Sequence, residues 1–336
     1  MNSFRKFLIG LPLVVTVASL VVLFGVPESP GNTVDTELNF TFTYKLNIDK
    51  IPDGSKSVEI WLPLPIDNGY QKVLDYKISS ELPYQLDIEP EYGNRILRFS
   101  SGEYVPEDLE IIVDINVIRY EQDGWNQIPY AVSNDSPDLR RYLLPDILVP
   151  IDGPVEAEAK QVVNGSMTTS QKVEALYHHL FETMKYDKSG IGWGNGDALY
   201  ACESRKGNCT DIHSLFIGMA RSLDIPSRFI MGFPLPQGKK RVQIPGYHCW
   251  AEFYIEGRGW VPVDISEAIK HPEKKDYFFG RLDCHRVAFT TGRDIKVNSG
   301  ESSHTLNYFI YPYAEADGKP VEVERSFSFR DAEADR

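Results

Sequence analysis

One stretch of the sequence, from Gly207 to Leu223, limits the possible folds and chemistry more than any other. Apolar residues recur in it at the spacing of a single helix face: Ile212, Leu215, Phe216, Met219 and Leu223. Gly207 and Asn208 precede this pattern, and asparagine is a favoured N-cap residue. The pattern predicts an amphipathic helix with Cys209 in its first turn. There the unpaired N–H groups and the helix dipole favour the nucleophilic thiolate over the thiol.

A thiolate nucleophile needs a base, and a predicted hairpin further along the chain contains the candidate, His248. Residues 247–255 and 260–264 are interpreted as its two strands, because Glu256-Gly257-Arg258-Gly259 between them is typical of a hairpin connection. His248 shares one face of the first strand with Trp250 and Glu252, and we expect this face to meet the start of the helix. The other face is apolar and is expected to face the core: Cys249, Ala251, Phe253 and Ile255.

The second strand ends with Asp264, which could orient the base. Paired strands lie about 5 Å apart, so Asp264 reaches the imidazole if the register of the hairpin matches. We therefore predict a catalytic triad of Cys209, His248 and Asp264. In it the aspartate fixes the tautomer of the histidine and stabilises its charged form.

Other residues near the cysteine have alternative interpretations. His213 lies one helical turn after Cys209 and could also be the base. A side chain on the nucleophile's own helix is badly placed for proton transfer, however, so we expect a structural role for it. Asp211 is interpreted as a first-turn residue that the dipole favours. The backbone N–H of Cys209 is one expected oxyanion donor, and the second stays open among Trp193, Tyr200 and Asn208.

The sequence contains four motifs in a characteristic order: Gly-Asn-Cys-Thr-Asp (207–211), Asp-Ile-Pro-Ser-Arg-Phe-Ile-Met-Gly (224–232), Tyr-His-Cys-Trp-Ala-Glu-Phe-Tyr (247–254) and Gly-Trp-Val-Pro-Val-Asp (259–264). In their order and spacing they resemble the core of the transglutaminase-like superfamily, and the similarity covers about residues 155–290. The resemblance implies an α+β, papain-like core in which a helix bearing the cysteine packs on an antiparallel sheet. It also implies that Cys209, His248 and Asp264 act as described above.

The resemblance does not imply crosslinking, because bacterial relatives are often regarded as peptidases or amidases that share the acyl-thioester chemistry. The remainder of the chain resembles bacterial exported members, which carry a β domain ahead of the core. The sequence shows no calcium loop of the EF-hand type, so we expect neither a metal nor a cofactor.

The sequence around this core also predicts β structure. Alternating apolar residues at Leu38–Ile48, Val58–Leu62 and Leu109–Val117, with turns between them, predict an N-terminal β-sandwich. Thr168 and Gln171 can form a capping box ahead of a helix. We expect the following parts in order: a linker at residues 27–36, the sandwich at 37–122, a connector at 123–154, the catalytic domain at 155–290 and a β-rich C-terminal extension at 291–336.

The first 26 residues are interpreted as a membrane anchor or a signal peptide. Phe7 to Val26 carry no charge and follow Arg5 and Lys6, which predicts a cytoplasmic N-terminus and an exported body. No Ala-x-Ala-like site is visible near Gly25, so we favour an uncleaved anchor. The expected location is extracytoplasmic, in the periplasm or at the cell surface. The net charge of −13 argues against nucleic acid as a partner.

The chain has four cysteines, and Cys209 must stay free if it is the nucleophile. We interpret Cys249 as buried and reduced. A bridge between Cys202 and Cys284 stays open, because an exported protein can form disulfides.

Together these features predict a thiol enzyme that acts on amide or peptide bonds through a thioester. We favour hydrolysis over transfer to an amine, because water is abundant and no amine pocket is visible in the sequence. The substrate is expected to be a peptide or protein, with cell-envelope peptides among the candidates. The alternative is a catalytically silent envelope protein that binds a partner or serves as a scaffold. A papain-type protease is disfavoured, because the glutamine that precedes the cysteine in such enzymes is absent before Cys209.

Overall fold

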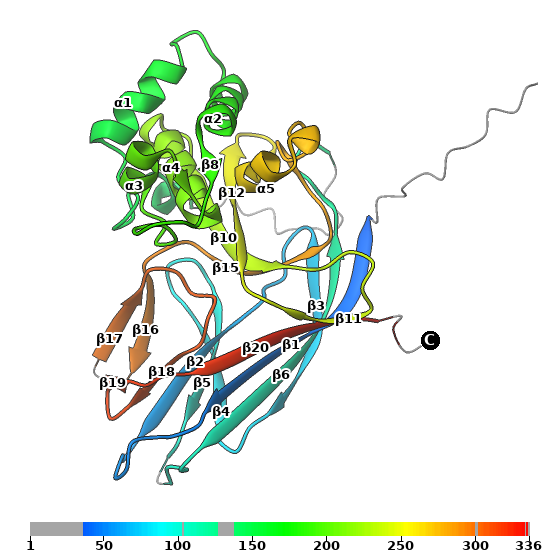
Figure 1. Ribbon diagram of the computed structural model, residues 1–336, viewed down its shortest axis with the longest axis vertical. Helices are drawn as coiled ribbons and strands as arrows, with labels where there is room; N and C mark the ends of the chain where they lie inside the picture. The colour runs from blue at the N-terminus through cyan, green and yellow to red at the C-terminus, as the bar shows by residue number, and fades with distance from the viewer. Residues whose placement is uncertain (1–35, 103, 127–137, 300–301, 333, 335–336) are drawn as a thin grey trace, which may run out of the picture. The chain divides into compact units, whose positions relative to one another are not determined.

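A computed structural model describes residues 36–102, 104–126, 138–299, 302–332 and 334 (Figure 1). The predicted anchor at residues 1–26 lies outside the described residues. Within the described part of the chain, no helix has both the length and the apolar character needed to cross a lipid bilayer.

The first of two five-stranded antiparallel sheets contains the strongest strand pattern of the sequence. Its strands follow the order β11 (Arg241–Ile244), β20 (Glu324–Asp331), β1 (Glu37–Ile48), β6 (Leu109–Tyr120) and β3 (Gln71–Ser79). The alternation in β1 is confirmed, because the side chains that the pattern assigned to the inner face are buried: Leu38, Phe40, Phe42, Tyr44, Leu46 and Ile48.

The second five-stranded sheet follows the order β19 (Lys319–Pro320), β18 (Tyr313–Ala316), β2 (Val58–Leu64), β5 (Arg95–Ser100) and β4 (Tyr84–Ile88). Buried residues of both sheets belong to one hydrophobic core. The C-terminal strands complete both sheets, because β20 pairs with β1 and β18 pairs with β2. Residues 313–331 thus share their sheets with the N-terminal strands instead of standing apart from them.

The predicted catalytic region forms a smaller antiparallel sheet with helices beside it. The strands follow the order β13 (Gly259–Val263), β12 (His248–Ile255), β10 (Ser227–Pro234) and β15 (Arg286–Thr291). Figure 1 shows the helices gathered beside β10 and β12: α1 (Gly153–Val162), α2 (Thr169–Thr183), α3 (Ala198–Ser204), α4 (Cys209–Ser222) and α5 (Ile265–Lys270). The fold is therefore α+β, with a helix bearing the cysteine packed on an antiparallel sheet.

Three short pairs of strands and two 3-10 helices complete the described elements. The pairs are β7 (Gln122–Asp123) with β14 (Arg281–Leu282), β16 (Ile295–Ser299) with β17 (Ser302–Leu306) and β8 (Lys185–Tyr186) with β9 (Lys206–Gly207). The 3-10 helices are η1 (Arg140–Leu143) and η2 (Pro272–Lys274). The predicted capping box at the start of α2 is confirmed. The Thr168 side chain accepts a hydrogen bond from the Gln171 backbone N–H, and the Gln171 side chain accepts one from the Thr168 backbone N–H.

Helix α4 is buried on all sides, whereas the sequence predicted an amphipathic helix. It contacts α1, α2 and α3 as well as β10 and β12, and all residues from Cys209 to Arg221 are buried. Its polar residues bond to partners far away in the sequence. Arg221 Nη1 lies 2.7 Å from Asp146 Oδ2, and Arg293 Nη1 donates to Ser214 Oγ at 2.7 Å. Buried polar groups are tolerated when they are paired in this way.

The larger sheets hold the small sheet in place through β15 and β10. The ring of Phe42 lies 4.9 Å from that of Phe233 and 5.2 Å from that of Phe289. The Gln71 side chain binds both backbone groups of Ala288, donating to its carbonyl at 2.8 Å and accepting from its N–H at 2.9 Å. These contacts fix the sheet on which the candidate site is built.

Candidate active site

The start of α4 has the cap that the sequence predicted. The Asn208 side chain accepts hydrogen bonds from the N–H groups of Thr210 at 2.9 Å and Asp211 at 3.3 Å. The Asp211 carboxylate accepts from the Asn208 N–H at 3.0 Å, which completes a capping box. Cys209 is thus the first residue of the helix. Its backbone N–H has no partner within the helix, so its expected role as an oxyanion donor stays a prediction.

Asp211 also anchors the glycine-rich loop that lies before α3. Its two carboxylate oxygens accept from the N–H groups of Gly194 at 2.7 Å and Gly196 at 2.9 Å. Arg293 donates to the carbonyls of Asn195 at 3.1 Å and Gly196 at 3.2 Å. Burial raises the pKa of Asp211, although these backbone hydrogen bonds oppose the rise. The loop therefore lies beside the first turn of the helix that carries the cysteine.

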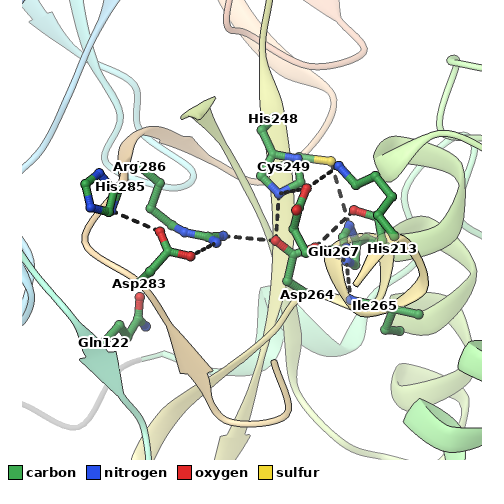
Figure 2. Close-up of polar contacts among 12 residues, drawn as sticks. Gln122, His213, His248, Cys249, Asp264, Ile265, Glu267, Asp283, His285 and Arg286 are labelled. Carbon is green, nitrogen blue, oxygen red and sulfur yellow. Dashed lines mark hydrogen bonds and ion pairs between the residues drawn. The ribbon is translucent and has the colours of Figure 1, made fainter. Parts of the chain in front are cut away.

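His248 and Asp264 form a direct pair, with His248 Nε2 2.6 Å from Asp264 Oδ2 (Figure 2). The hairpin register pairs Ala251 with Val263, so continuing it places Asp264 opposite Trp250 and not opposite His248. Asp264 lies just beyond β13 as the N-cap of α5, where the chain leaves the sheet. Its Oδ1 accepts from the Glu267 N–H at 3.0 Å and thereby leaves Oδ2 for the imidazole.

The Cys209 thiol and the His248 ring lie close enough for each to shift the pKa of the other. Because Nε2 is bonded to Asp264, Nδ1 is the nitrogen left for the sulfur. Burial alone lowers the pKa of His248, but the charge and hydrogen bond of Asp264 outweigh it and raise the value to about 10. The pKa of Cys209 lies well below its usual value, first because of a hydrogen bond with Cys249 and further because of His248, while burial opposes both. Both shifts act in the same direction, toward a thiolate beside an imidazolium.

All three predicted triad residues are thus close together and almost enclosed. Cys209 exposes 3% of its surface, His248 6% and Asp264 0%. Burial alone raises the pKa of Asp264, but the charges of His248 and Arg286 lower it well below its usual value. The geometry is that of a nucleophile, a base and an orienting carboxylate. Their catalytic roles stay predictions.

Arg286 is a residue of the site that the sequence reasoning missed. It lies on β15, is 3% exposed, and its Nη1 is 2.9 Å from the same Asp264 oxygen that binds His248 (Figure 2). Its Nη2 lies 3.0 Å from Asp283. One signal for it was present in the sequence: Arg286 directly precedes the apolar residues Val287, Ala288 and Phe289. A charged residue beside a buried strand indicates a buried partner of opposite charge, because such residues are buried only when they are paired.

Both faces of β12 are buried: Cys249, Ala251 and Phe253 as the sequence predicted, and His248, Trp250 and Glu252 as well. Cys249, on the face expected to face the core, contributes to the lowered pKa of Cys209. Its sulfur lies 3.8 Å from His213 Nδ1. His213, expected to be structural, has Nε2 3.6 Å from Asp264 Oδ1 and accepts from the Ile265 N–H at 3.0 Å (Figure 2). The two residues thus border the triad.

The spacing of His248, Asp264 and Glu267 is that of a possible set of metal ligands, because one ligand atom of each lies within 4.8 Å of the others. These atoms already have partners. His248 and Asp264 bind each other, and Glu267 forms an ion pair with Lys270. The cluster is accounted for as a hydrogen-bond network, and it supplies no argument for a metal.

Two further predictions concern the second oxyanion donor and the disulfide state of the cysteines. Asn208 Nδ2 donates to the Tyr247 hydroxyl at 3.2 Å, and the buried Tyr200 hydroxyl has no hydrogen-bond partner among the described residues. The second oxyanion donor stays open. None of the four cysteines, all of which the structure describes, forms a disulfide. Cys202 instead donates to Glu158 at 3.1 Å.

A cavity of about 530 Å³ lies where β11 ends beside β20, and Tyr311 is part of its lining. The Tyr311 ring lies 5.7 Å from that of Tyr247, whose hydroxyl binds the N-cap Asn208. Two aromatic side chains therefore connect the cavity with the start of α4.

Residues 156–265 match the sequence profile of the transglutaminase-like superfamily. An uncharacterized protein of Haemophilus influenzae is 28% identical over 335 residues, which cover 87% of this chain and 89% of that protein. A solved structure from Cytophaga hutchinsonii, described provisionally as a cysteine protease, is 18% identical and covers 88% of this chain and 100% of its own, with a TM-score of 0.49. The periplasmic domain of TgpA from Pseudomonas aeruginosa is 16% identical and covers 72% of this chain and 91% of its own, with a TM-score of 0.37. The profile match includes Cys209, His248 and Asp264, and it confirms the similarity to the transglutaminase-like superfamily for this part of the chain.

Proposed function

We propose that this protein hydrolyses amide bonds with Cys209 as the nucleophile, His248 as the acid and base, and Asp264 as the orienting group. One observation carries the proposal. A thiol at the start of a helix neighbours an imidazole whose Nε2 lies 2.6 Å from a fully buried carboxylate. This arrangement stores the imidazolium proton where a leaving amine needs it.

The reaction would proceed in two steps, acylation of Cys209 and hydrolysis of the thioester. The Cys209 thiolate attacks the carbonyl carbon, the C–N bond breaks, and the His248 imidazolium gives its proton to the leaving amine. A thioester to Cys209 results. His248 then takes a proton from water, whose oxygen attacks the thioester. The carboxylic acid leaves, and the thiolate and imidazolium are restored.

The substrate we propose is a peptide or protein outside the cytoplasm, with cell-envelope peptides as the first candidates. The uncharged stretch from Phe7 to Val26 after two basic residues is the support for this location. We place the substrate chain along the cavity beside Tyr311, because the Tyr311 ring contacts that of Tyr247, whose hydroxyl binds the cap residue Asn208. Water is the favoured acceptor, and an amine acceptor is an outcome that the experiment distinguishes.

The proposal predicts a covalent acyl adduct on Cys209. Wild-type protein is mixed with peptidoglycan stem peptides or casein peptides, quenched in acid and weighed by mass spectrometry. The expected result is a mass increase equal to the acyl part of a peptide, located at Cys209 and absent from Cys209→Ala. Addition of a simple primary amine should leave the free acid as the main product. An amide of the added amine would instead establish transfer, and an adduct at another residue would contradict the proposal.

The lowered pKa of Cys209 also predicts unusual reactivity toward iodoacetamide in acid. An ordinary thiol loses about 100-fold in alkylation rate between about pH 8 and about pH 6, because its thiolate fraction falls about tenfold per unit. Cys209 should change by less than about threefold over that range, since its thiolate persists below the ordinary thiol pKa. Cys202, whose pKa burial raises to about 11, should stay unlabelled.

Peptide mapping by mass spectrometry measures each site separately, and protein unfolded in guanidinium chloride is the control in which the cysteines should react alike. Turnover should also fall as the pH rises through about 10, the pKa of His248, because the imidazolium proton is then lost. A Cys209 that reacts like the unfolded control would contradict the thiolate.

A further inference from the structure

The strand that ends beside the cavity leaves part of its neighbour uncovered. Strand β11 has four residues, and the last of them, Ile244, lies opposite Phe327 of β20 (Figure 1). Pro245 follows, outside the strand. Arg325 lies two residues before Phe327 on β20 and is part of the cavity lining. The edge of β20 at Arg325 is therefore not covered by β11.

The backbone groups of Arg325 point toward this open edge. In an antiparallel sheet, successive residues of a strand direct their N–H and C=O groups to opposite neighbours. Asp331 donates its N–H to Lys240 at 2.9 Å, on the side of β11, and Ala332 donates to Asn39 of β1. Arg325 is an even number of residues before Asp331, so its N–H and C=O also face the side of β11. Neither group has a hydrogen-bond partner among the described residues.

The cavity at this edge lies a short length of chain from His248. Pro245 is part of its lining and comes three residues before His248, so at most about 11 Å of chain separates them. Tyr311, also in the lining, has its ring 5.7 Å from that of Tyr247. The Tyr247 hydroxyl binds Asn208, the N-cap of α4. A chain held at the edge can therefore continue toward the nucleophile.

The side chains of β20 give the two faces of this edge different chemistry. Arg325 and Phe327 share one face, and Glu324 lies on the other. On the first face, the Arg325 guanidinium lies 3.8 Å from the centre of the Tyr311 ring, which stacks on Phe327 at 5.8 Å. Glu324 is exposed and lines the cavity together with Glu322, and neither carboxylate has an ion-pair partner in the described part of the chain. One face suits an apolar side chain and the other a basic one.

We propose that the open edge of β20 at Arg325 binds an extended segment of the peptide substrate as an added antiparallel strand, with apolar side chains on the Tyr311 face and basic side chains on the Glu324 face. The inference rests on the proposed function and deepens it, because it assigns how the substrate chain is held. Strand addition takes its affinity from backbone hydrogen bonds and its preference from alternate side chains. The peptide continues the line of β11, so its residue opposite Arg325 exchanges both backbone hydrogen bonds with it.

The test measures the binding of fluorescein-labelled octapeptides of alternating valine and lysine by fluorescence anisotropy. The full chain carries Cys209→Ala, so that the peptide is not consumed. In the proposed pairing the valines face Tyr311 and direct their N–H groups to β20, whereas the lysine N–H groups face solvent. N-methylation of the valines should therefore weaken binding about tenfold or more, and N-methylation of the lysines, the matched control, by less than about threefold. Equal effects of the two modifications would overturn the inference.

Replacement of Arg325 by proline tests the same hydrogen bonds from the side of the protein. Arg325→Pro removes the N–H that faces the open edge but no hydrogen bond to β1, and proline is tolerated at strand edges. It should weaken binding of the unmodified peptide about fivefold or more, and Arg325→Ala, which keeps the N–H, should weaken it less. The matched control is Tyr76→Pro, because Tyr76 is exposed on β3, the opposite edge strand of the same sheet. That variant should bind as tightly as its Cys209→Ala parent.

Equal losses in Arg325→Pro and Tyr76→Pro, or in Arg325→Pro and Arg325→Ala, would contradict the added strand. If Arg325→Pro does not fold, the N-methylated peptides decide the question on the Cys209→Ala protein alone. A second copy of this chain is the other candidate for the edge. Sedimentation would detect it as a dimer that Arg325→Pro abolishes, and that result would also overturn the inference.

The charge preference has its own test. An octapeptide of alternating valine and glutamate should bind at least about threefold more weakly than the lysine peptide at low salt, because Glu322 and Glu324 then face like charges. Equal or tighter binding of the acidic peptide would overturn the assignment of basic side chains to the Glu324 face.

The inference and the proposed function can fail separately. Peptide binding that depends on the valine N–H groups, without any acyl adduct on wild-type Cys209, would support the edge as a peptide site and overturn the enzyme. An adduct that forms equally fast in wild type and in Arg325→Pro, together with binding that ignores N-methylation, would overturn the inference and leave the nucleophile intact.

Discussion

Replacement of Cys209 by alanine is expected to lower amide-bond turnover by a factor of about 10⁴ or more, because no other group can form the thioester. The cost to the free energy of unfolding should stay below about 2 kcal/mol. Alanine leaves a small gap where the sulfur was, but it also removes a buried charge that is costly to desolvate. The measurements are kcat/KM on a peptide that forms the acyl adduct and unfolding in urea.

Cys202→Ala is the matched control, because Cys202 is also a buried thiol but hydrogen-bonds to Glu158, away from the triad. It should keep wild-type turnover. Wild-type turnover in Cys209→Ala would show that the nucleophile lies elsewhere. It would also leave the silent envelope protein as an alternative for this chain.

Asp264→Asn is the second substitution with a large expected effect, a loss of about 10³ to 10⁴ in kcat/KM. Asparagine fills the same space but carries no charge, so the pKa of His248 should fall from its raised value of about 10. The imidazolium is then no longer favoured at neutral pH. The thiolate loses its charged partner, and the labelling of Cys209 by iodoacetamide should decline as the pH falls.

The control for this substitution is Asp283→Asn. Asp283 binds the same arginine as Asp264, with Arg286 Nη2 3.0 Å from its carboxylate, but it makes no contact with His248 among the described residues. Both variants weaken the hold on Arg286, yet only Asp264→Asn should change the labelling profile of Cys209. Equal changes in the two variants would assign the effect to Arg286 and not to the pair of His248 and Asp264.

The features that were predicted from the sequence depend on local rules. Asn208 caps a helix because its short side chain reaches the N–H groups two and three residues later. A cap of this kind can be predicted from the few residues around it. The alternation in β1 fixes which side chains are buried, because successive residues of a strand face opposite sides. The position of Cys209 at a helix start, and of His248 on a nearby strand, followed from such patterns.

The features that were missed depend on contacts between distant segments. The position of Asp264 depends on the hairpin register and on the turn into α5, and no periodicity specifies either. The burial of α4 depends on Asp146 and Arg293, which pair with its polar residues from far along the chain. Arg286 reaches Asp264 because β15 joins the sheet beside β10, a pairing that a single sequence does not reveal.

The placement of β18 and β20 has a consequence for biosynthesis. Because these strands pair with β2 and β1, neither large sheet can close until residues 313–331 have left the ribosome. Phe327 of β20 packs 4.5 Å from Phe233 of β10, the strand beside the one that carries His248. The sheet that carries His248 therefore gains this support only after residues 313–331 have been made.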